Sequence, residues 1–237
     1  MRAKKLFGPL VLMIFAAAYF VPATDAEDFA DRGSVKRWKV YDYTHRPHLR
    51  GRHPYFLAPE SIAFDFLLKP NTAFLVTSHP HYDGELLGDM TGRNLVAFLD
   101  VSVTPGTEFM YFGEPDGCPE PADVRYYFET DTSGKFEETD YWWSPGGVDL
   151  DSLTGPGGLL YISGFFASGW EDYFGHPATL DAAHEEAFQR AVQDVRSIGL
   201  SFGGGCSRGN GVGIVPGTGS GYFILGHFEA YYPADPL

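Results

Sequence analysis

Glycine and proline are spread along the whole chain in short clusters, and this distribution limits the possible folds more than any other feature. The sequence has 29 Gly and 17 Pro among its 237 residues. Both residues interrupt helices, glycine through its backbone freedom and proline through its missing amide hydrogen. The chain also contains 20 Phe and 14 Tyr, which favour strands. The sequence therefore argues against a helical bundle and favours many short strands separated by turns.

Short apolar segments between these turns show the alternation that is typical of β-strands. In residues 94–103, Leu95, Leu99 and Val101 fall on one face, and residues 123–130 alternate in the same way. Lys69-Pro70-Asn71 and Ser133-Gly134 are turn sequences next to such segments. Further strands are predicted at residues 38–43, 62–68, 72–77, 135–143, 158–163, 198–202 and 221–228.

One segment has helical rather than strand periodicity. Apolar residues recur at helical spacing over residues 180–196, the opposite face is charged, and Thr179 or Asp181 can cap the start. Many short strands and one late helix predict an all-β fold, namely a jelly-roll β-sandwich with this helix packed against a sheet. We expect one β-sandwich domain over residues 38–237, preceded by a flexible leader over residues 27–37.

The first 26 residues are typical of a secretory signal peptide. Basic residues precede an apolar stretch from Leu6 to about Val21, and small residues follow it near residues 23–26. The stretch contains Gly8 and Pro9 and is shorter than the roughly 20 residues that a membrane span needs. This disfavours the alternative of an uncleaved anchor. We therefore expect a secreted or periplasmic protein without a membrane span after signal cleavage.

Charge and cysteine content narrow the class of partner and the compartment. The formal net charge is −14, which repels phosphate backbones and disfavours nucleic-acid binding. The chain has two cysteines, Cys118 and Cys206. An even number in an exported chain favours a single disulfide between them, with two free thiols as the alternative.

A His-x-His-x-Asp sequence follows one of the apolar segments. In an extended chain, His79 and His81 would point the same way and could hold zinc, while Asp83 could serve a second metal or act as a base. The sequence resembles the metal-binding turn of metallo-β-lactamase-type hydrolases, but Gly84 stands where that family has a further histidine. A polar loop without a metal is the alternative. The Asp149–Asp151 segment could similarly contribute to a calcium site.

Four aromatic residues, Trp142, Trp143, Trp170 and Tyr173, lie in or beside loops rich in glycine and acidic residues. Planar rings flanked by polar groups suit the apolar faces of sugars, with hydrogen bonds at the ring edges. Because neighbouring strand residues face opposite ways, one of Trp142 and Trp143 should fill the core and the other should face outward. The sequence thus predicts these four residues as ligand-binding, with core packing alone as the alternative.

The order of several aromatic and glycine-rich motifs resembles a known group of proteins. The motifs are Leu87-Gly88-Asp89, Tyr126-Tyr127-Phe128-Glu129-Thr130, Tyr141-Trp142-Trp143-Ser144, the segment from Ile198 to Cys206, Asn210-Gly211-Val212-Gly213 and Gly221-Tyr222-Phe223-Ile224-Leu225. This order resembles a family of secreted bacterial jelly-roll proteins of unassigned function, often with sorting tails, and more distantly the laminin IV type A (laminin B) domain. The resemblance covers roughly residues 70–229. It implies a galactose-binding-like jelly roll without catalytic activity in an extracellular setting.

These observations together predict a secreted, non-catalytic binding module for an extracellular polysaccharide or matrix polymer. No cofactor is required, although calcium or zinc would fit the motifs above. One alternative is a zinc-dependent hydrolase built on His79, His81 and Asp83. The other is an exported protein with a purely structural role. Bound metal would favour the zinc-dependent hydrolase over the binding module. An exposed aromatic residue beside a groove would favour the binding module over a purely structural protein.

Overall fold

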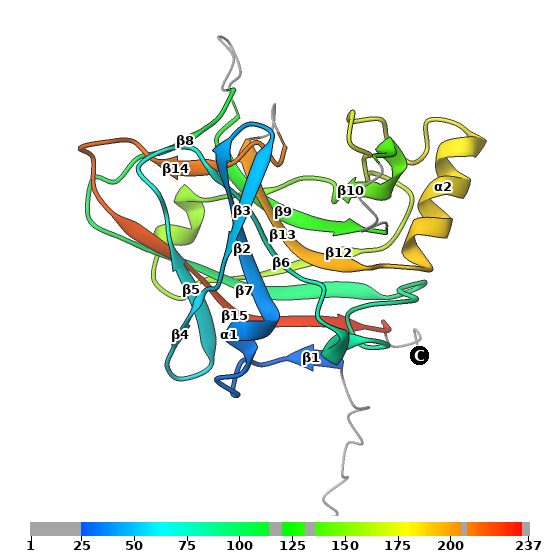
Figure 1. The fold of residues 1–237 in the computed structure, drawn as a ribbon, viewed down its shortest axis with the longest axis horizontal. Helices are drawn as coiled ribbons and strands as arrows, with labels where there is room; N and C mark the ends of the chain where they lie inside the picture. Colours follow the sequence, from blue (N-terminus) through cyan, green and yellow to red (C-terminus); the bar gives the residue numbers. More distant parts are fainter. Residues whose placement is uncertain (1–24, 114–119, 131–135, 205–207, 234–237) are drawn as a thin grey trace, which may run out of the picture.

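The structure is a computed structural model that describes residues 25–113, 120–130, 136–204 and 208–233. Within these residues, two antiparallel β-sheets pack as a sandwich, and the longer of two helices lies at one end of it (Figure 1). The prediction of an all-β sandwich with one packed helix is therefore confirmed.

The smaller sheet is built around two long neighbouring strands. Its strands are β1 (Asp25–Glu27), β4 (Tyr55–Leu57), β5 (Ser61–Asp65), β7 (Asn94–Val103), β12 (Leu159–Gly164) and β15 (Gly221–Tyr231). The strand order is β12-β7-β15-β5-β4, and β1 also pairs with β15. Leu99 lies opposite Leu225 at the centre of the sheet, which places the alternating apolar residues of both strands on the core side.

The larger sheet has a long central strand flanked by aromatic strands. Its strands are β2 (Trp38–His45), β3 (His48–Arg52), β6 (Thr72–Thr77), β8 (Phe109–Tyr111), β9 (Ala122–Glu129), β10 (Tyr141–Trp143), β11 (Val148–Asp149), β13 (Ser197–Gly204) and β14 (Val212–Ile214). The main order is β10-β9-β13-β6-β14-β8, and β11 pairs with β9. Strand β2 pairs with both β6 and β3, so the β2–β3 hairpin extends the sheet beside β6.

The helices are short and lie between strands. They are α1 (Ser34–Arg37) and α2 (Ala182–Val192), with 3-10 turns η1 (Pro80–Tyr82), η2 (Glu138–Asp140) and η3 (Asp151–Thr154). Asp181 caps α2, since its carboxylate accepts from the backbone N–H groups of Ala183 and His184 at 3.0 and 2.9 Å. The helix ends four residues before the predicted residue 196, because Val195 exchanges two backbone hydrogen bonds with Gly88.

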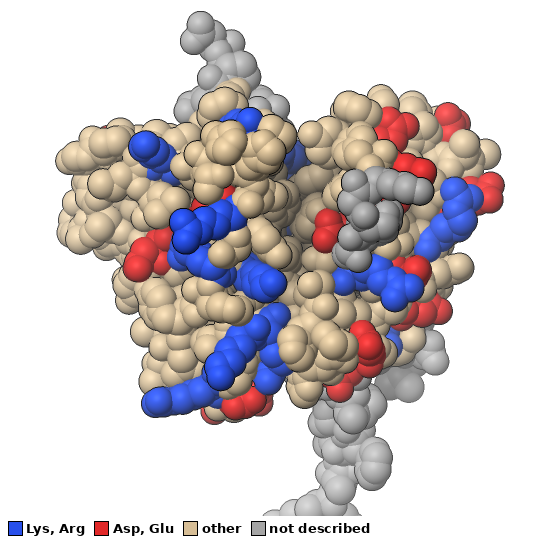
Figure 2. All heavy atoms as spheres, in the orientation of Figure 1, with Lys and Arg blue, Asp and Glu red and all other residues tan. Residues whose placement is uncertain are grey.

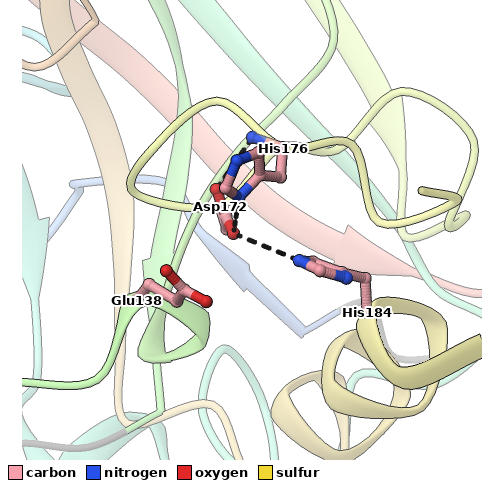
Figure 3. A group of neighbouring side chains, drawn as sticks. All are labelled: Glu138, Asp172, His176 and His184. Carbon is pink, nitrogen blue, oxygen red and sulfur yellow. Dashed lines mark hydrogen bonds and ion pairs between the residues drawn. The ribbon is translucent and has the colours of Figure 1, made fainter. Parts of the chain in front are cut away.

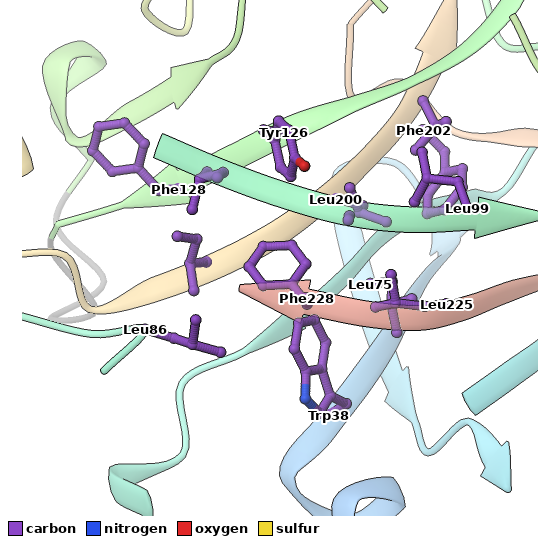
Figure 4. Close-up of a cluster of buried hydrophobic side chains, with 14 of the residues drawn as sticks. Trp38, Leu75, Leu86, Leu99, Tyr126, Phe128, Leu200, Phe202, Leu225 and Phe228 are labelled. Atoms are coloured by element: carbon purple, nitrogen blue, oxygen red, sulfur yellow. The ribbon is translucent and has the colours of Figure 1, made fainter. Parts of the chain in front are cut away.

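Aromatic side chains dominate the core between the two sheets. Trp38 and Phe228 meet edge to face with ring centroids 5.2 Å apart (Figure 4). Phe128 packs on Trp170 at the same distance. Phe188 connects α2 to this core and is fully buried. Each such side chain stabilises the fold by roughly 1.5–3 kcal/mol through burial.

Residues 27–37, which were predicted to form a flexible leader, make defined contacts with the sandwich in the structure. The buried Glu27 carboxylate accepts hydrogen bonds from Ser34 at 3.0 Å and from Arg37 at 3.1 Å. Phe29 is fully buried and packs on Trp38 with ring centroids 5.7 Å apart. The polar composition suggested a solvated segment, but Arg37 pairs with Glu27 and Asp31, and the single aromatic residue of the segment, Phe29, enters the core.

Several predictions about export fall on residues that the structure does not describe. Residues 1–24 of the predicted signal peptide and both cysteines, Cys118 and Cys206, lie outside the described ranges. The signal peptide and the disulfide therefore stay predictions. Among the described residues, each helix is too short or too polar to cross a bilayer.

Candidate functional site

The outer face of the larger sheet is unusual because its central strand carries only small side chains there. Strand β13 turns Ser197, Gly199 and Ser201 to this face, while its alternate residues enter the core. The neighbouring strands present aromatic rings instead: Phe74 of β6 and Tyr127 of β9 meet across β13 with ring centroids 4.7 Å apart. A shallow channel with an aromatic floor follows from this alternation of small and large residues.

Trp143 continues this aromatic floor toward the loop after residue 170. Its ring lies 5.0 Å from that of Tyr127 and 6.3 Å from that of Tyr173, measured between centroids. The Trp143 indole N–H donates to Ser201 Oγ at 2.9 Å, and its backbone exchanges two hydrogen bonds with Glu171. Trp143 is nearly buried at 5% exposure, whereas Tyr173 is 53% exposed. Tyr173 is thus the accessible end of this row of rings.

Two walls turn the channel into a groove of about 1080 Å³. One wall is β2 with the β2–β3 turn, and the other is formed by residues 136–141 and 172–175. Figure 2 shows the hollow between these two parts of the face, with Lys and Arg gathered mainly on the β2–β3 side. Its lining residues include Lys39, Tyr41, Tyr43, Phe74, Glu129, Tyr141, Trp143, Tyr173, Arg208 and Asn210.

Polar groups at the edge of the aromatic floor are held in defined directions. Burial raises the pKa of Tyr127 well above its usual value, so its phenol stays protonated and donates to Glu129 Oε2 at 2.9 Å. Burial likewise raises the pKa of Tyr43, whose hydroxyl donates to the Gly209 carbonyl at 3.2 Å. The groove therefore combines neutral aromatic faces with fixed hydroxyl, carboxylate and cationic groups.

The structure divides the four aromatic residues that the sequence predicted as ligand-binding. Trp143 and Tyr173 line the groove, but Trp142 and Trp170 are fully buried in the core. The buried indoles satisfy their N–H groups internally, Trp142 on the Thr139 carbonyl and Trp170 on the Gly164 carbonyl, both at 2.8 Å. This corrects the ligand-binding role for Trp142 and Trp170. The predicted opposite facing of Trp142 and Trp143 matches the two separate clusters in which they pack.

The groove also contains aromatic residues that sequence reasoning did not single out. Tyr41 and Tyr43 stand on β2, and Phe74 and Tyr127 stand on β6 and β9. Alternation along residues 38–43 places Tyr41 and Tyr43 on one face, which is a signal that was present in the sequence. The sequence contains no comparable signal for the pairing of these strands around β13, because that pairing depends on contacts between distant segments.

The predicted metal-binding turn has a different geometry in the structure. Pro80–Tyr82 forms the 3-10 turn η1 rather than an extended chain. His79 Nδ1 accepts from the His81 backbone N–H at 3.1 Å, so this imidazole caps the turn. The two imidazoles and Asp83 are exposed, and the imidazole centroids are 6.5 Å apart. The structure does not bring His79, His81 and Asp83 together as metal ligands.

The acidic pair at residues 149 and 151 has a local structural role. Asp149 Oδ1 accepts from the Asp151 backbone N–H at 2.9 Å and so holds the start of η3. Within the described ranges, a different group of metal-ligating side chains lies close together, at the 172–175 wall of the groove. It consists of Glu138, Asp172, His176 and His184, which come from three separate segments.

Comparisons with known proteins identify no family for this chain. No family model matches it, and no curated protein matches it. Among solved structures, it is similar to a Bacteroides thetaiotaomicron protein that is provisionally named a glycoside hydrolase. That similarity has a TM-score of 0.36 and 9% identity, and it covers 90% of this chain and 72% of the other. At these values it assigns neither fold nor activity. The resemblance to secreted jelly-roll proteins and to the laminin IV type A domain stays a prediction.

Proposed function

We propose that this protein is a secreted or periplasmic carbohydrate-binding module, and that an extracellular polysaccharide or matrix glycan lies in the groove. The observation that carries the proposal is the row of aromatic rings from Phe74 through Tyr127 and Trp143 to Tyr173, edged by polar groups. A sugar ring has an apolar C–H face and a rim of hydroxyl groups. Aromatic faces and fixed polar groups complement these two parts.

The size of the groove favours an extended ligand. Its volume of about 1080 Å³ lies just above the roughly 300–1,000 Å³ that is usual for small-molecule sites. A single monosaccharide would fill only part of it. Several consecutive sugar units of a polysaccharide fit this space better.

The two carboxylates on the groove are engaged by protein groups, which favours binding over catalysis. Glu129 accepts from Tyr127, and Asp172 Oδ1 accepts from two backbone N–H groups. A glycosidase needs two carboxyl groups that flank the scissile bond at a defined separation, one to give a proton and one to attack or to activate water. In the proposed module, Glu129 and Asp172 instead hold the side chains and the loop that shape the groove, and the module is non-catalytic.

Replacing Tyr173 with alanine is expected to weaken polysaccharide binding about 5- to 30-fold. The ring is half exposed on the groove wall, and its loss would remove roughly 1–2 kcal/mol of contact with a sugar face. Binding would be measured by affinity electrophoresis and calorimetry against a panel of soluble neutral and uronic-acid-containing polysaccharides.

The matched control is Phe166→Ala. Phe166 is 59% exposed, close to the 53% of Tyr173, and does not line the groove. Its removal should leave affinity unchanged. Equal losses in both variants, or no binding by the wild-type protein across the panel, would contradict the proposal.

A further inference from the structure

Four potential metal ligands converge from three segments at the α2 end of the groove. Glu138 comes from η2, Asp172 and His176 from one loop, and His184 from the first turn of α2 (Figure 3). One ligand atom of each side chain lies within 4.8 Å of the other three. Figure 3 shows Glu138 and His184 on either side of Asp172, with His176 next to it.

Asp172 is fixed in position before any ion binds. The residue is buried, and its Oδ1 accepts from the backbone N–H groups of Phe174 at 2.9 Å and His176 at 2.8 Å. These bonds leave Oδ2 to face the two imidazoles. The distances from Oδ2 are 3.2 Å to His176 Nδ1 and 3.9 Å to His184 Nε2. The aspartate is therefore the fixed centre of the cluster.

His184 directs its Nε2 toward this carboxylate. Its Nδ1 lies 2.8 Å from Asp181 Oδ1, and because a carboxylate accepts hydrogen bonds, Nδ1 is the donor in this contact. In the neutral ring, Nε2 then carries the lone pair. In the described part of the chain, Nε2 is buried without a hydrogen-bond partner. Two electron-rich atoms facing each other in a buried site repel unless a cation lies between them.

The donor set and spacing suit a transition metal better than calcium or magnesium. Two imidazoles with two carboxylates are ligands typical of zinc, whereas Ca²⁺ and Mg²⁺ prefer oxygen alone. Zinc bonds of about 2.0–2.1 Å in a tetrahedron place ligand atoms roughly 3.3 Å apart. The 3.2 Å between Asp172 Oδ2 and His176 Nδ1, a hydrogen bond in this structure, is close to this value, while the 3.9 Å to His184 Nε2 is longer. All four ligand atoms lie within 4.8 Å of one another, so small side-chain movements would bring them to the distances of a bound ion. Asp181 behind His184 completes a carboxylate–histidine–metal arrangement.

We propose that Glu138, Asp172, His176 and His184 bind one divalent transition-metal ion of the zinc class, with Asp181 as a positioning residue. The ion joins η2, the loop that carries Tyr173, and α2. It thereby fixes the wall of the groove. The site does not rest on carbohydrate binding, since its ligands and its test are separate. A proton on His184 Nε2 is the alternative occupant of the space, and the experiment distinguishes the two.

The test is zinc binding by the full chain after removal of metals with a chelator. Calorimetry with Zn²⁺ alone is expected to give one equivalent. Co²⁺ in its place should give visible absorption bands of a four-coordinate ion. The double variant His176→Ala/His184→Ala should bind zinc about 100-fold more weakly or worse. Loss of a residue that only supports a metal ligand already costs about 10- to 100-fold in affinity, and this variant loses two ligands. The matched control, His79→Ala/His81→Ala, removes two exposed imidazoles outside the cluster and should bind like the wild type.

Absence of zinc binding by the wild-type chain would overturn the site, as would unchanged affinity in the His176→Ala/His184→Ala variant. Loss of zinc in the His79→Ala/His81→Ala control would overturn it as well. Circular dichroism of the metal-free variants checks folding. If the double variant unfolds, the single variant His176→Ala replaces it in the zinc titration. The His176 side chain is 46% exposed, so its removal should not unfold the protein.

Asp181→Asn tests the positioning role separately. Asparagine caps helices as well as aspartate does, so α2 should persist. Zinc affinity should fall about tenfold, because His184 loses its ionised partner. An affinity equal to that of the wild type would remove Asp181 from the site.

Discussion

Replacing Trp170 with alanine is expected to lower the free energy of unfolding by about 3–5 kcal/mol, the usual cost of emptying a large aromatic site in a core. The indole is fully buried and stacks on Phe165 with ring centroids 5.4 Å apart. It also packs on Phe128 and Phe188, and so connects the larger sheet to α2. A cavity at this position is enclosed on several sides and cannot collapse easily.

Denaturant unfolding of Trp170→Ala beside Tyr173→Ala would measure this loss. Both residues are aromatic, and both were predicted from the sequence to bind a ligand, but Tyr173 is 53% exposed. Its removal should therefore change the free energy of unfolding by less than about 1 kcal/mol. Similar stability losses in the two variants would contradict the division between core and groove residues.

Replacing Gly199 with alanine is expected to cost more than about 4 kcal/mol, the range reached only by severe disruptions. An added Cβ would lie 2.2 Å from the Leu75 carbonyl oxygen and 2.8 Å from the Val76 Cα. Both atoms belong to the backbone of β6, so a side-chain rotation cannot relieve the contact. Since β13 is paired on both sides, with β6 and β9, the sheet beneath the groove would have to open.

Gly155→Ala is the matched control for Gly199→Ala. Gly155 has φ −77°, and an added Cβ meets no atom within 4 Å. Its replacement should change the free energy of unfolding by no more than about 0.5 kcal/mol. Thermal and denaturant unfolding of both variants would show the difference. Equal effects would mean that the close approach of β13 to β6 is not what requires glycine.

Local patterns in the sequence predicted the longer elements of the fold, but not the short strands β1, β3, β4, β8, β11 and β14. Alternation over residues 94–103 predicted strand β7, and the structure gives it the same bounds. Thr179 or Asp181 was expected to cap the helix, and the structure shows that Asp181 does so. Side-chain alternation and capping act within a few residues of the chain, so one sequence contains enough information to find them.

The functional residues could be predicted only in part. Trp143 and Tyr173 reach the groove as expected, but composition alone could not tell that Trp142 and Trp170 fill the core. The histidines with the most suggestive spacing, His79 and His81, end up exposed on a turn. Local spacing predicts neighbours along the chain, whereas binding sites depend on which segments meet.

By itself, the sequence determined the strand-rich class of this protein, the alternation of its strands and the position of its helix, because these follow from short-range propensity and periodicity. Only the tertiary structure decided the groove and the Glu138–His184 cluster. The groove requires small residues on β13 to lie between aromatic residues of β6 and β9, and the cluster requires η2, the 172–176 loop and α2 to meet. These segments are distant in the chain and are brought together by strand pairing and core packing, which no local pattern specifies.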